Sequence, residues 1–417
     1  MKGVNTTRSA GGPFSPRGSA GAPGTSIVPV RSGWRAALRV WWSELDRVLL
    51  LLIMLIMAMG IIAVLAASPA SADRLSTREV TLDPFLFFKR HIIWLAAGFA
   101  GMLALSFLSR DQARRLGLLA ALGTFGLLML VPIIGFEKGG STRWINLGMS
   151  LQPSEFLKPG FAIAVAWVLS WRQRDPGLPV FWLVTGFTLA IGALLMLQPN
   201  FGATVLFAAT WFVLIVIGGL SWLRAFGIAA FAPVLGVLIY FTYPNGRNRI
   251  DDFLGGGTAY DQVDLAGRTL ANGGWDGKGL WLGTRKFNLP EAHTDYIFSV
   301  LGEEFGLWTC AFVLVLYLAL IGRVLVRLAS EDDLFSLLAA TGLVTLFGGQ
   351  AFMNMAVNLE LAPAKGMTLP LISYGGSSML AVCFTLGLLL AITRRNPYLE
   401  RDIPGLRTLF ERKEARA

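Results

Sequence analysis

Charged residues are scarce in this chain of 417 residues, because Asp, Glu, Lys and Arg make up only 15% of it. In globular domains such residues make up roughly a quarter of the chain. Cysteine and histidine are scarcer still, with two of each. Cys310 and Cys383 lie in apolar stretches, so we expect neither a disulfide framework nor a thiolate metal site. With only His91 and His293, we expect no histidine-rich metal cluster either.

Apolar residues take the place of charge: 54% of the chain is hydrophobic, and the mean hydropathy is +0.59. Val48–Ala67, Leu116–Ile134 and Phe201–Trp222 contain no charged residue. Runs of roughly 20 residues match the hydrocarbon thickness of a bilayer when they are helical. The sequence therefore predicts an all-α polytopic integral membrane protein.

The apolar runs predict about ten transmembrane helices between two tails. Residues 1–45 are interpreted as a disordered basic tail and residues 398–417 as a second tail, with the membrane domain at 46–397. The predicted spans are residues 47–67, 91–108, 116–134, 156–171, 179–198, 202–221, 225–243, 303–325, 335–358 and 377–393.

The distribution of Lys and Arg predicts the orientation. The side that carries both termini holds 22 of the 36, whereas the other side holds 14, of which six lie in one long loop at residues 244–302. Long loops count little in the positive-inside rule, so both termini are expected in the cytoplasm. The same bias accounts for the net charge of +10, and we expect no nucleic-acid partner.

The long extracytoplasmic loop between the seventh and eighth spans ends in LPEAHTD, which leads into an apolar run. Thr294 and Asp295 have two interpretations. In the first, Thr294 is the N-cap and Asp295 the first residue of a helix; the carboxylate stabilises the helix, and the helix N-terminus lowers the pKa of the aspartate. Alternatively, Asp295 is a general base at the membrane surface, with His293 orienting it or contacting a phosphate.

The shorter outer segment at residues 135–155 contains STRWINLG. Arg143 and Trp144 fit either an interfacial anchor or a surface that stacks on a sugar and binds a phosphate. Lys158 follows one turn inside the next span, where an ammonium is by default a candidate site residue; the alternative is that its side chain snorkels to the interface.

Basic residues interleaved with glycine and tryptophan occur in the long loop. Arg247, Arg249, Lys278 and Arg285 are suited to a diphosphate, although the alternative is a solvated, turn-rich loop.

The segment LAPAKGMTLPLISYGGSSML breaks the apolar pattern before the last span. It contains Lys365 and Ser373. Broken backbone at membrane depth needs protein or a water-filled cavity beside it, which favours a segment that lines a cavity. We include both residues among the candidates for substrate binding.

Taken together, these segments resemble the SEDS family (shape, elongation, division and sporulation) of polytopic peptidoglycan polymerases. The resemblance spans residues 45–397 and rests on STRWINLG with LQPSEFLK, LQPNFG, GGWDGKGLWLGTRK with LPEAHTDYIFSVLGEEFG, and PAKGMTLPLISYGGSS, in that order. LPEAHTD and KGMTLPLISYGGSS resemble the division branch more than the elongation branch.

The resemblance implies an inverting glycosyltransferase that polymerises lipid II at the outer leaflet of the inner membrane during septal wall synthesis. Asp295 matches the family's essential acidic position, and Trp144 matches a functionally important tryptophan. Asn200 stands where the family usually has aspartate, which leaves Asp295 as the better candidate for the base.

The resemblance also implies a class B penicillin-binding protein as the transpeptidase partner, together with other division proteins and membrane lipid. The sequence indicates no cofactor, and the lack of an Asp-x-Asp pair leaves the need for a divalent cation open. A lipid II flippase and a noncatalytic division scaffold remain alternative hypotheses.

Overall fold

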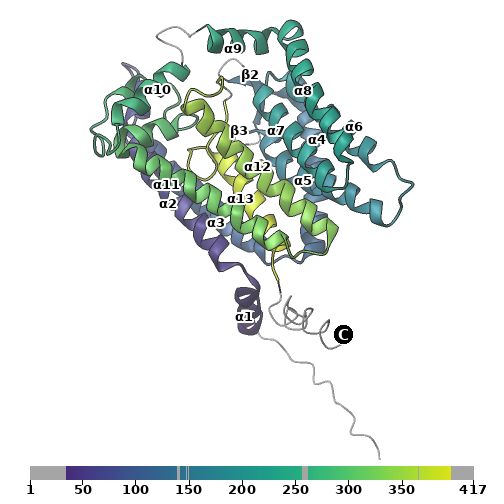
Figure 1. The fold of residues 1–417 in the computed structure, drawn as a ribbon. Helices are drawn as coiled ribbons and strands as arrows, with labels where there is room; N and C mark the ends of the chain where they lie inside the picture. The colour runs from purple at the N-terminus through teal and green to yellow at the C-terminus, as the bar shows by residue number, and fades with distance from the viewer. Residues whose placement is uncertain are drawn as a thin grey trace, which may run out of the picture. The chain divides into compact units, whose positions relative to one another are not determined.

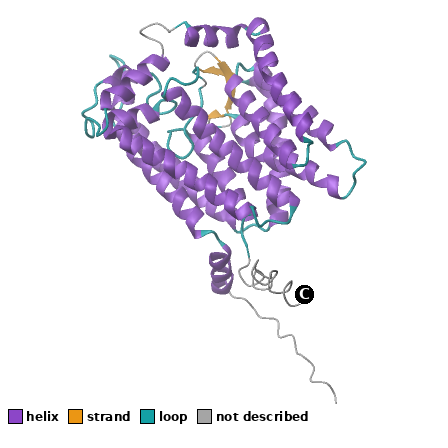
Figure 2. Cartoon of the chain, in the orientation of Figure 1, coloured by secondary structure: helices purple, strands orange, loops and turns teal. Residues whose placement is uncertain are grey.

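The computed structural model describes residues 34–138, 141–146, 148, 150–255, 262–364 and 366–395, without the side chains of residues 36, 37, 138, 141, 245, 249, 252 and 253. Helices dominate this part of the chain, and its strands form one small sheet (Figures 1 and 2). The predicted all-α architecture is confirmed.

Helices in the described residues coincide with each predicted span. The α-helices are α1 (Trp34–Glu44), α2 (Arg47–Leu75), α3 (Leu86–Ser106), α4 (Arg110–Ile134), α5 (Pro153–Ser170), α6 (Val180–Leu197), α7 (Phe201–Ile217), α8 (Trp222–Thr242), α9 (Pro244–Leu254), α10 (Gln262–Gly273), α11 (Ile297–Leu328), α12 (Leu334–Asn358) and α13 (Gly376–Ile392). Two short 3₁₀ helices, η1 (Trp171–Gln173) and η2 (Arg285–Asn288), complete the set.

Seven helices of the described chain are long and apolar enough to cross a membrane: α2, α3, α4, α6, α8, α11 and α12. Helices α7 and α13 are apolar but shorter, with 17 residues each. Helix α5 has 18 residues and carries Glu155 and Lys158 near its start. The chain is thus a multi-pass membrane protein, whereas the count of ten crossings stays a prediction.

Residues 34–43 of helix α1 belong to one unit, and the described chain from Glu44 onward belongs to a second. The sequence places α1 within a disordered tail at residues 1–45, but Trp34–Glu44 is helical. This stretch contains neither glycine nor proline, and Trp34, Leu38 and Trp42 recur at helical spacing. Residues 1–33 and 396–417 lie outside the described chain.

The core of the second unit is formed by α5, α12 and α13, whose side chains are mostly buried. Helix α5 packs closely on α4 because glycine stands at the crossing: a Cβ on Gly160 would lie 2.6 Å from the backbone nitrogen of Ala121. At the other extreme, α8 buries only Ala225 among its described side chains and lies at the edge of the bundle (Figure 1).

The described residues of the shorter outer segment form an antiparallel sheet that the sequence does not predict. Its strands are β1 (Phe136–Lys138), β2 (Ser141–Asn146) and β3 (Ser150–Leu151), in the order β1-β2-β3. Phe136 pairs with Trp144 across the first two strands. The sheet holds Ser141–Asn146, the first six residues of the STRWINLG motif, in an extended conformation.

The long loop predicted at residues 244–302 contains α9, α10 and η2, and α11 begins inside it at Ile297. Helix α11 is interrupted at Gly306, whose φ of 80° lies in the left-handed region. Only glycine fits there, because a Cβ would lie 2.1 Å from the carbonyl oxygen of Trp275. The predicted start at residue 303 therefore falls next to the kink, six residues after the helix begins.

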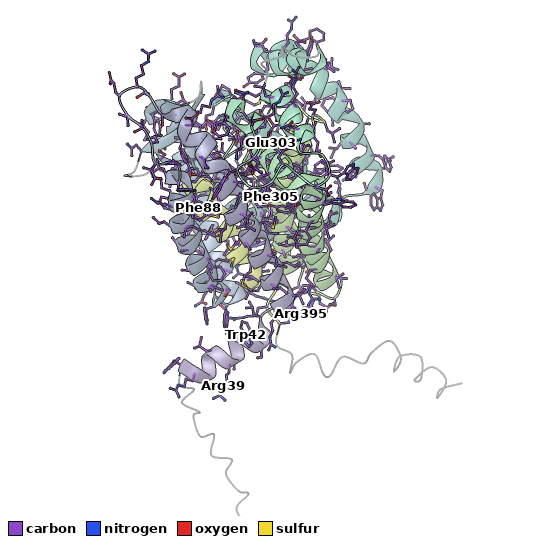
Figure 3. The ribbon with its side chains drawn as sticks, turned by 90° about the vertical axis from the view of Figure 1, so that its left-hand side faces the viewer. Arg39, Trp42, Phe88, Glu303, Phe305 and Arg395 are labelled. Carbon is purple, nitrogen blue, oxygen red and sulfur yellow. The ribbon has the colours of Figure 1, made fainter. Side chains whose placement is uncertain are left out.

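Ion pairs tie together the helix ends on one side of the bundle. Asp46 caps α2 and also binds Arg323 and Arg327 near the end of α11, at 2.8 and 3.0 Å. Arg395 donates a hydrogen bond to the carbonyl of Arg327, which brings the end of α13 to the same place. Glu303 lies at the other end of the bundle (Figure 3). Since Asp295 precedes α11, it lies at the end opposite this ion-pair cluster.

Candidate active site at the start of helix α11

Asp295 lies in a turn just before α11, not in the first turn of the helix. The cap residue of α11 is Tyr296, which makes no side-chain cap hydrogen bond. The Thr294 hydroxyl donates instead to the Glu291 carboxylate, at 2.7 Å. The interpretation of Thr294 and Asp295 as a helix cap is therefore wrong, because the helix begins two residues later than that interpretation requires.

The turn around Asp295 is fixed through its backbone. The side-chain amides of Asn354 and Asn358 on α12 donate to the Asp295 carbonyl, at 2.7 and 3.0 Å. Ser373 donates to the carbonyl of Thr294, at 2.6 Å. Within the described chain, the Asp295 carboxylate accepts no hydrogen bond, so it stays available to a ligand.

A small pocket opens beside this carboxylate. Its lining includes Asp295, Asn354, Gly366 and Met367. A Cβ built on Gly366 would lie 3.6 Å from both the Asp295 Oδ2 and the Arg143 Nη1. Gly366 has a φ of 63°, which favours glycine and leaves this space open between the carboxylate and the guanidinium.

The pKa of Asp295 is raised from 3.8 to about 7, chiefly because burial disfavours the charged form. The nearby charges of Glu291 and Glu155 raise the pKa further, and Arg143 opposes them. The sequence predicts the opposite shift from a helix N-terminus. That expectation is wrong because the side chain lies ahead of the helix and within the fold.

Arg143 and Trp144 both lie on β2. Arg143 is buried; it donates from Nε to the carbonyl of Gln198 at 3.1 Å and also binds the carbonyl of Pro199. It thus joins the sheet to the connection between α6 and α7 and contributes positive charge beside Asp295. Trp144 packs against Phe136, with ring centroids 6.5 Å apart.

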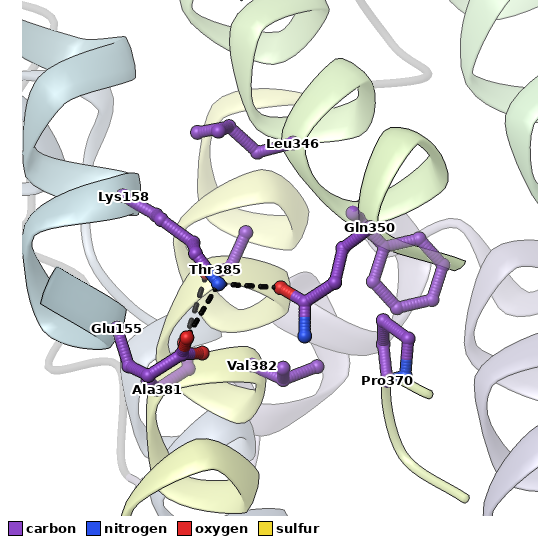
Figure 4. A pocket seen from close by; sticks show the side chains of 9 residues that line it. Glu155, Lys158, Leu346, Gln350, Pro370, Ala381, Val382 and Thr385 are labelled. Atoms are coloured by element: carbon purple, nitrogen blue, oxygen red, sulfur yellow. Dashed lines mark hydrogen bonds and ion pairs between the residues drawn. The ribbon is translucent and has the colours of Figure 1, made fainter. Parts of the chain in front are cut away.

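The ammonium of Lys158 is buried between two side-chain oxygen atoms that accept hydrogen bonds from it. Its ammonium lies 2.7 Å from Glu155 Oε1 and 2.6 Å from Gln350 Oε1, in a second pocket between α5, α12 and α13 (Figure 4). The Gln350 amide donates to the carbonyl of Thr368, at 2.9 Å. Lys158 therefore supports the segment that carries Gly366, and its charge is already paired.

His293 and Ser373 hold the turn and the last broken segment together. The His293 ring packs on Phe87 and Tyr374, with centroids 4.2 and 5.4 Å away. The backbone amide of Tyr374 donates to the His293 carbonyl, at 2.9 Å. Ser373 accepts from the amide of Leu369, at 2.7 Å, while it donates to Thr294.

The basic candidates of the long loop are not joined to Asp295 by any hydrogen bond or ion pair of the described residues. Arg247 on α9 pairs with Asp251 at 3.4 Å, and the side chains of Lys278 and Arg285 are exposed. The side chain of Arg249 and the whole of Lys365 lie outside the described residues.

Two buried glutamates attach the long loop to α11. Glu303, labelled in Figure 3, accepts from the backbone amides of Arg285 and Lys286, at 2.7 and 2.9 Å. Glu304 pairs with the Lys286 ammonium, which also donates to the carbonyl of Ala66 at 3.0 Å. These contacts position the stretch that leads to Asp295.

The asparagine pair on α12, the two glutamates of α11 and Glu155 are not among the site residues that the sequence predicts. Asn354 and Asn358 stand four residues apart within a predicted span, and polar residues at such depth are a signal of function. Gly366 had no comparable signal, since its importance depends on what packs against it.

Asn200 caps α7, and its side chain accepts from the amide of Ala203 at 3.4 Å. Within the described chain, no group of three or more His, Cys, Asp or Glu residues is placed to hold a metal ion.

The long apolar helices define a multi-pass membrane protein, and Asp295 lies in a small pocket just before the start of one of them. The family model described as "Cell cycle protein" (FTSW_RODA_SPOVE) matches residues 46–398. The chain belongs to this family, as its motifs predict.

Relatives and solved structures agree with that assignment. A protein of Caulobacter vibrioides named "Probable peptidoglycan glycosyltransferase FtsW" is 37% identical, over 87% of this chain and 93% of the relative. One of the same name from Methylococcus capsulatus is 35% identical, over 84% of this chain and 89% of the relative.

Among solved structures, one titled "Structural coordination of polymerization and crosslinking by a peptidoglycan synthase complex" matches with a TM-score of 0.69. It is 28% identical and covers 84% of this chain and 98% of that one. The rod shape determining protein RodA of Thermus thermophilus matches with a TM-score of 0.63 and 28% identity, over 85% of this chain and 99% of that chain.

Proposed function

We propose that this protein is an inverting glycosyltransferase that polymerises lipid II into glycan strands during septal wall synthesis. Its family membership and its relatives named peptidoglycan glycosyltransferase support this activity. In the proposed orientation both termini are cytoplasmic, so the start of α11 faces the outer leaflet of the inner membrane. The lipid-linked disaccharides react at that membrane–water boundary.

The observation that carries the proposal is the state of Asp295. Its carboxylate is half-buried in a pocket, accepts no hydrogen bond within the described residues and has a pKa raised to about 7. A general base works best when its pKa lies near the working pH. Asp295 accepts the proton of the acceptor's 4-hydroxyl as that oxygen bonds to C1 of the donor sugar. The bond from C1 to the lipid diphosphate breaks, and the diphosphate leaves with the electron pair.

Positive charge must stabilise the leaving diphosphate. Arg143 is the cation that the structure places beside Asp295, and we assign it to this charge. Lys278, Arg285, Arg247, Arg249 and Lys365 belong to the proposed substrate-binding set with it. Trp144, on the same strand as Arg143, supplies an aromatic face for a sugar ring.

The proposed partner is a class B penicillin-binding protein that crosslinks the new strand at the division septum, alongside other division proteins. The solved complex whose title joins polymerisation with crosslinking supports this pairing. The proposed mechanism needs no cofactor. Whether the reaction requires a divalent cation is tested by adding a chelator to the assay.

A paired assay of the purified protein tests the proposal against a lipid II flippase. Polymerisation of lipid II is measured in detergent, with the class B partner present and with or without chelator. Transport of labelled lipid II is measured in vesicles. We expect glycan strands in the first assay and no transport above empty vesicles in the second. Transport without polymerisation contradicts the proposal, as does the absence of both activities, which fits a scaffold.

A further inference from the structure

A cavity of about 490 Å³ lies at the end of the bundle opposite Asp295. It lies between the start of α4, the end of α5 and the start of α12. Arg110, Arg114 and Arg174 line it, together with Trp167 and Trp171. The ion pair of Arg110 with Glu331, just after α11, places the cavity at the end opposite the catalytic turn.

The three arginines differ in how far their charge is already balanced. Arg110 holds Glu331 through two hydrogen bonds of 2.9 and 3.0 Å, and Arg114 pairs with Asp111 at 2.9 Å. The guanidinium of Arg174 has no hydrogen-bond or ion-pair partner among the described residues, whereas its backbone amide donates to the carbonyl of Trp171 at 2.9 Å. The cavity therefore presents an uncompensated guanidinium.

The acidic residues of the lining are already occupied. Asp111 holds Arg114, and Asp333 caps α12 by accepting from the amide and hydroxyl of Ser336, at 3.0 and 2.6 Å. Neither carboxylate compensates Arg174 through an ion pair. The positive charge is thus left for a ligand.

Two tryptophans give the cavity an apolar wall. Trp167 and Trp171 pack edge to face, with ring centroids 5.5 Å apart, and Trp171 is 38% exposed. Tryptophan is typical of the boundary between acyl chains and headgroups. Basic pockets between transmembrane helices are suited to anionic headgroups.

We propose that this cavity binds the phosphate headgroup of an anionic phospholipid. Arg174 and the free N–H groups of Arg114 donate to the phosphate oxygens, and Trp171 lies against the glycerol and the first acyl carbons. Because the cavity lies at the start of the apolar helix α4, it is placed where headgroups meet acyl chains, and a lipid gains apolar contact there that a soluble anion lacks. In the orientation proposed above, the lipid belongs to the inner leaflet.

Binding of short-chain phosphatidylglycerol to the purified full-length protein tests this site. Arg174→Gln removes the unpaired charge from an exposed turn. Arg115→Gln is the matched control, because Arg115 lies on the same end of α4, is exposed and does not line the cavity. We expect Arg174→Gln to weaken binding roughly fivefold and the control to change it less than twofold.

Short-chain phosphatidylcholine and inorganic phosphate are titrated in parallel, and thermal unfolding confirms that both variants fold. The site is supported if phosphatidylcholine and inorganic phosphate each bind with an affinity at least fivefold lower than that of phosphatidylglycerol. Equal binding of phosphatidylcholine overturns the need for negative charge, and equal binding of inorganic phosphate overturns the assignment to a lipid. Equal losses in the two variants overturn the role of the cavity. None of these readouts depends on polymerisation.

Discussion

The side-chain amide of Asn358 donates a hydrogen bond of 3.0 Å to the backbone carbonyl of Asp295, which lies 63 residues earlier in the chain. The oxygen of the same side chain accepts from the amide and hydroxyl of Ser299, at 3.1 and 2.8 Å. One buried residue of α12 thus fixes both the proposed catalytic turn and the first turn of α11.

Replacing Asn358 by alanine should therefore lower activity and stability together. The substitution leaves the buried Ser299 groups without their acceptor, which costs roughly 1–3 kcal/mol of unfolding free energy. Because the aspartate also loses a backbone anchor, we expect kcat to fall more than KM rises. Thermal unfolding and steady-state polymerisation measure the two effects.

Thr210→Val is the control for this substitution. The Thr210 hydroxyl is also buried, but it donates only within its own helix, to the carbonyl of Leu206 at 2.8 Å. Its loss should leave kcat near the wild-type value. A normal kcat in Asn358→Ala would show that the anchor does not position Asp295.

The pH dependence of polymerisation should report the ionisation of Asp295. Only the ionised carboxylate accepts a proton, so activity rises with pH through the pKa of about 7. The charge of Glu291 raises that pKa. Glu291→Gln should therefore shift the rising limb to lower pH while keeping an acceptor for Thr294. An unchanged limb in a full pH–rate profile would rule out this coupling.

Arg143 acts on the same carboxylate with the opposite sign. Its positive charge favours the ionised form, so Arg143→Gln should raise the pKa of Asp295 and move the limb to higher pH. Arg143→Lys keeps the charge and should leave the limb near its wild-type position, although it loses part of the contact with Gln198. A limb that moves equally in both variants would mean that geometry, not charge, sets the profile.

The buried pair of Lys286 and Glu304 should be critical for folding of the long loop. Lys286→Met leaves the Glu304 charge buried without its ammonium, which costs about 3–5 kcal/mol. Thermal unfolding checks this value, and the double variant with Glu304→Gln should recover much of the loss. Arg285→Met is the control, since that exposed neighbour should change stability by under about 0.5 kcal/mol. Equal effects of the two single substitutions would contradict the role of the pair.

The sequence predicted the position of the helices better than their ends. Uninterrupted apolar runs such as Val48–Ala67 are sufficient to locate a span, because lipid tolerates few charges. The sequence predicts the start of the eighth span at residue 303, six residues after α11 begins, since Glu303 and Glu304 resemble a membrane boundary. Both are buried within the helix, because the loop folds back and supplies their hydrogen-bond donors.

The sequence predicts the main residue of the candidate site but not its surroundings, because tertiary contacts determine those surroundings. LPEAHTD pointed to Asp295 as a residue, and the structure places Arg143 beside it. The direction of the pKa shift is not predictable from the local sequence alone, because its largest cause is the burial of the carboxyl within the fold. Local rules described a helix start, whereas tertiary contacts from α12 and Gly366 determine the environment.

Polymerisation by purified Asp295→Asn protein, with its class B partner present, tests the central claim most directly. Asparagine keeps the size of the side chain but cannot accept the hydroxyl proton. We expect the rate to fall by roughly 100-fold or more. The raised pKa means that the folded protein holds the Asp295 proton more tightly than the unfolded chain, so stability falls as pH rises from about 4 to 7. At pH 8 the substitution should therefore leave the melting temperature unchanged or higher. A near wild-type rate in a normally folded variant would contradict Asp295 as the base.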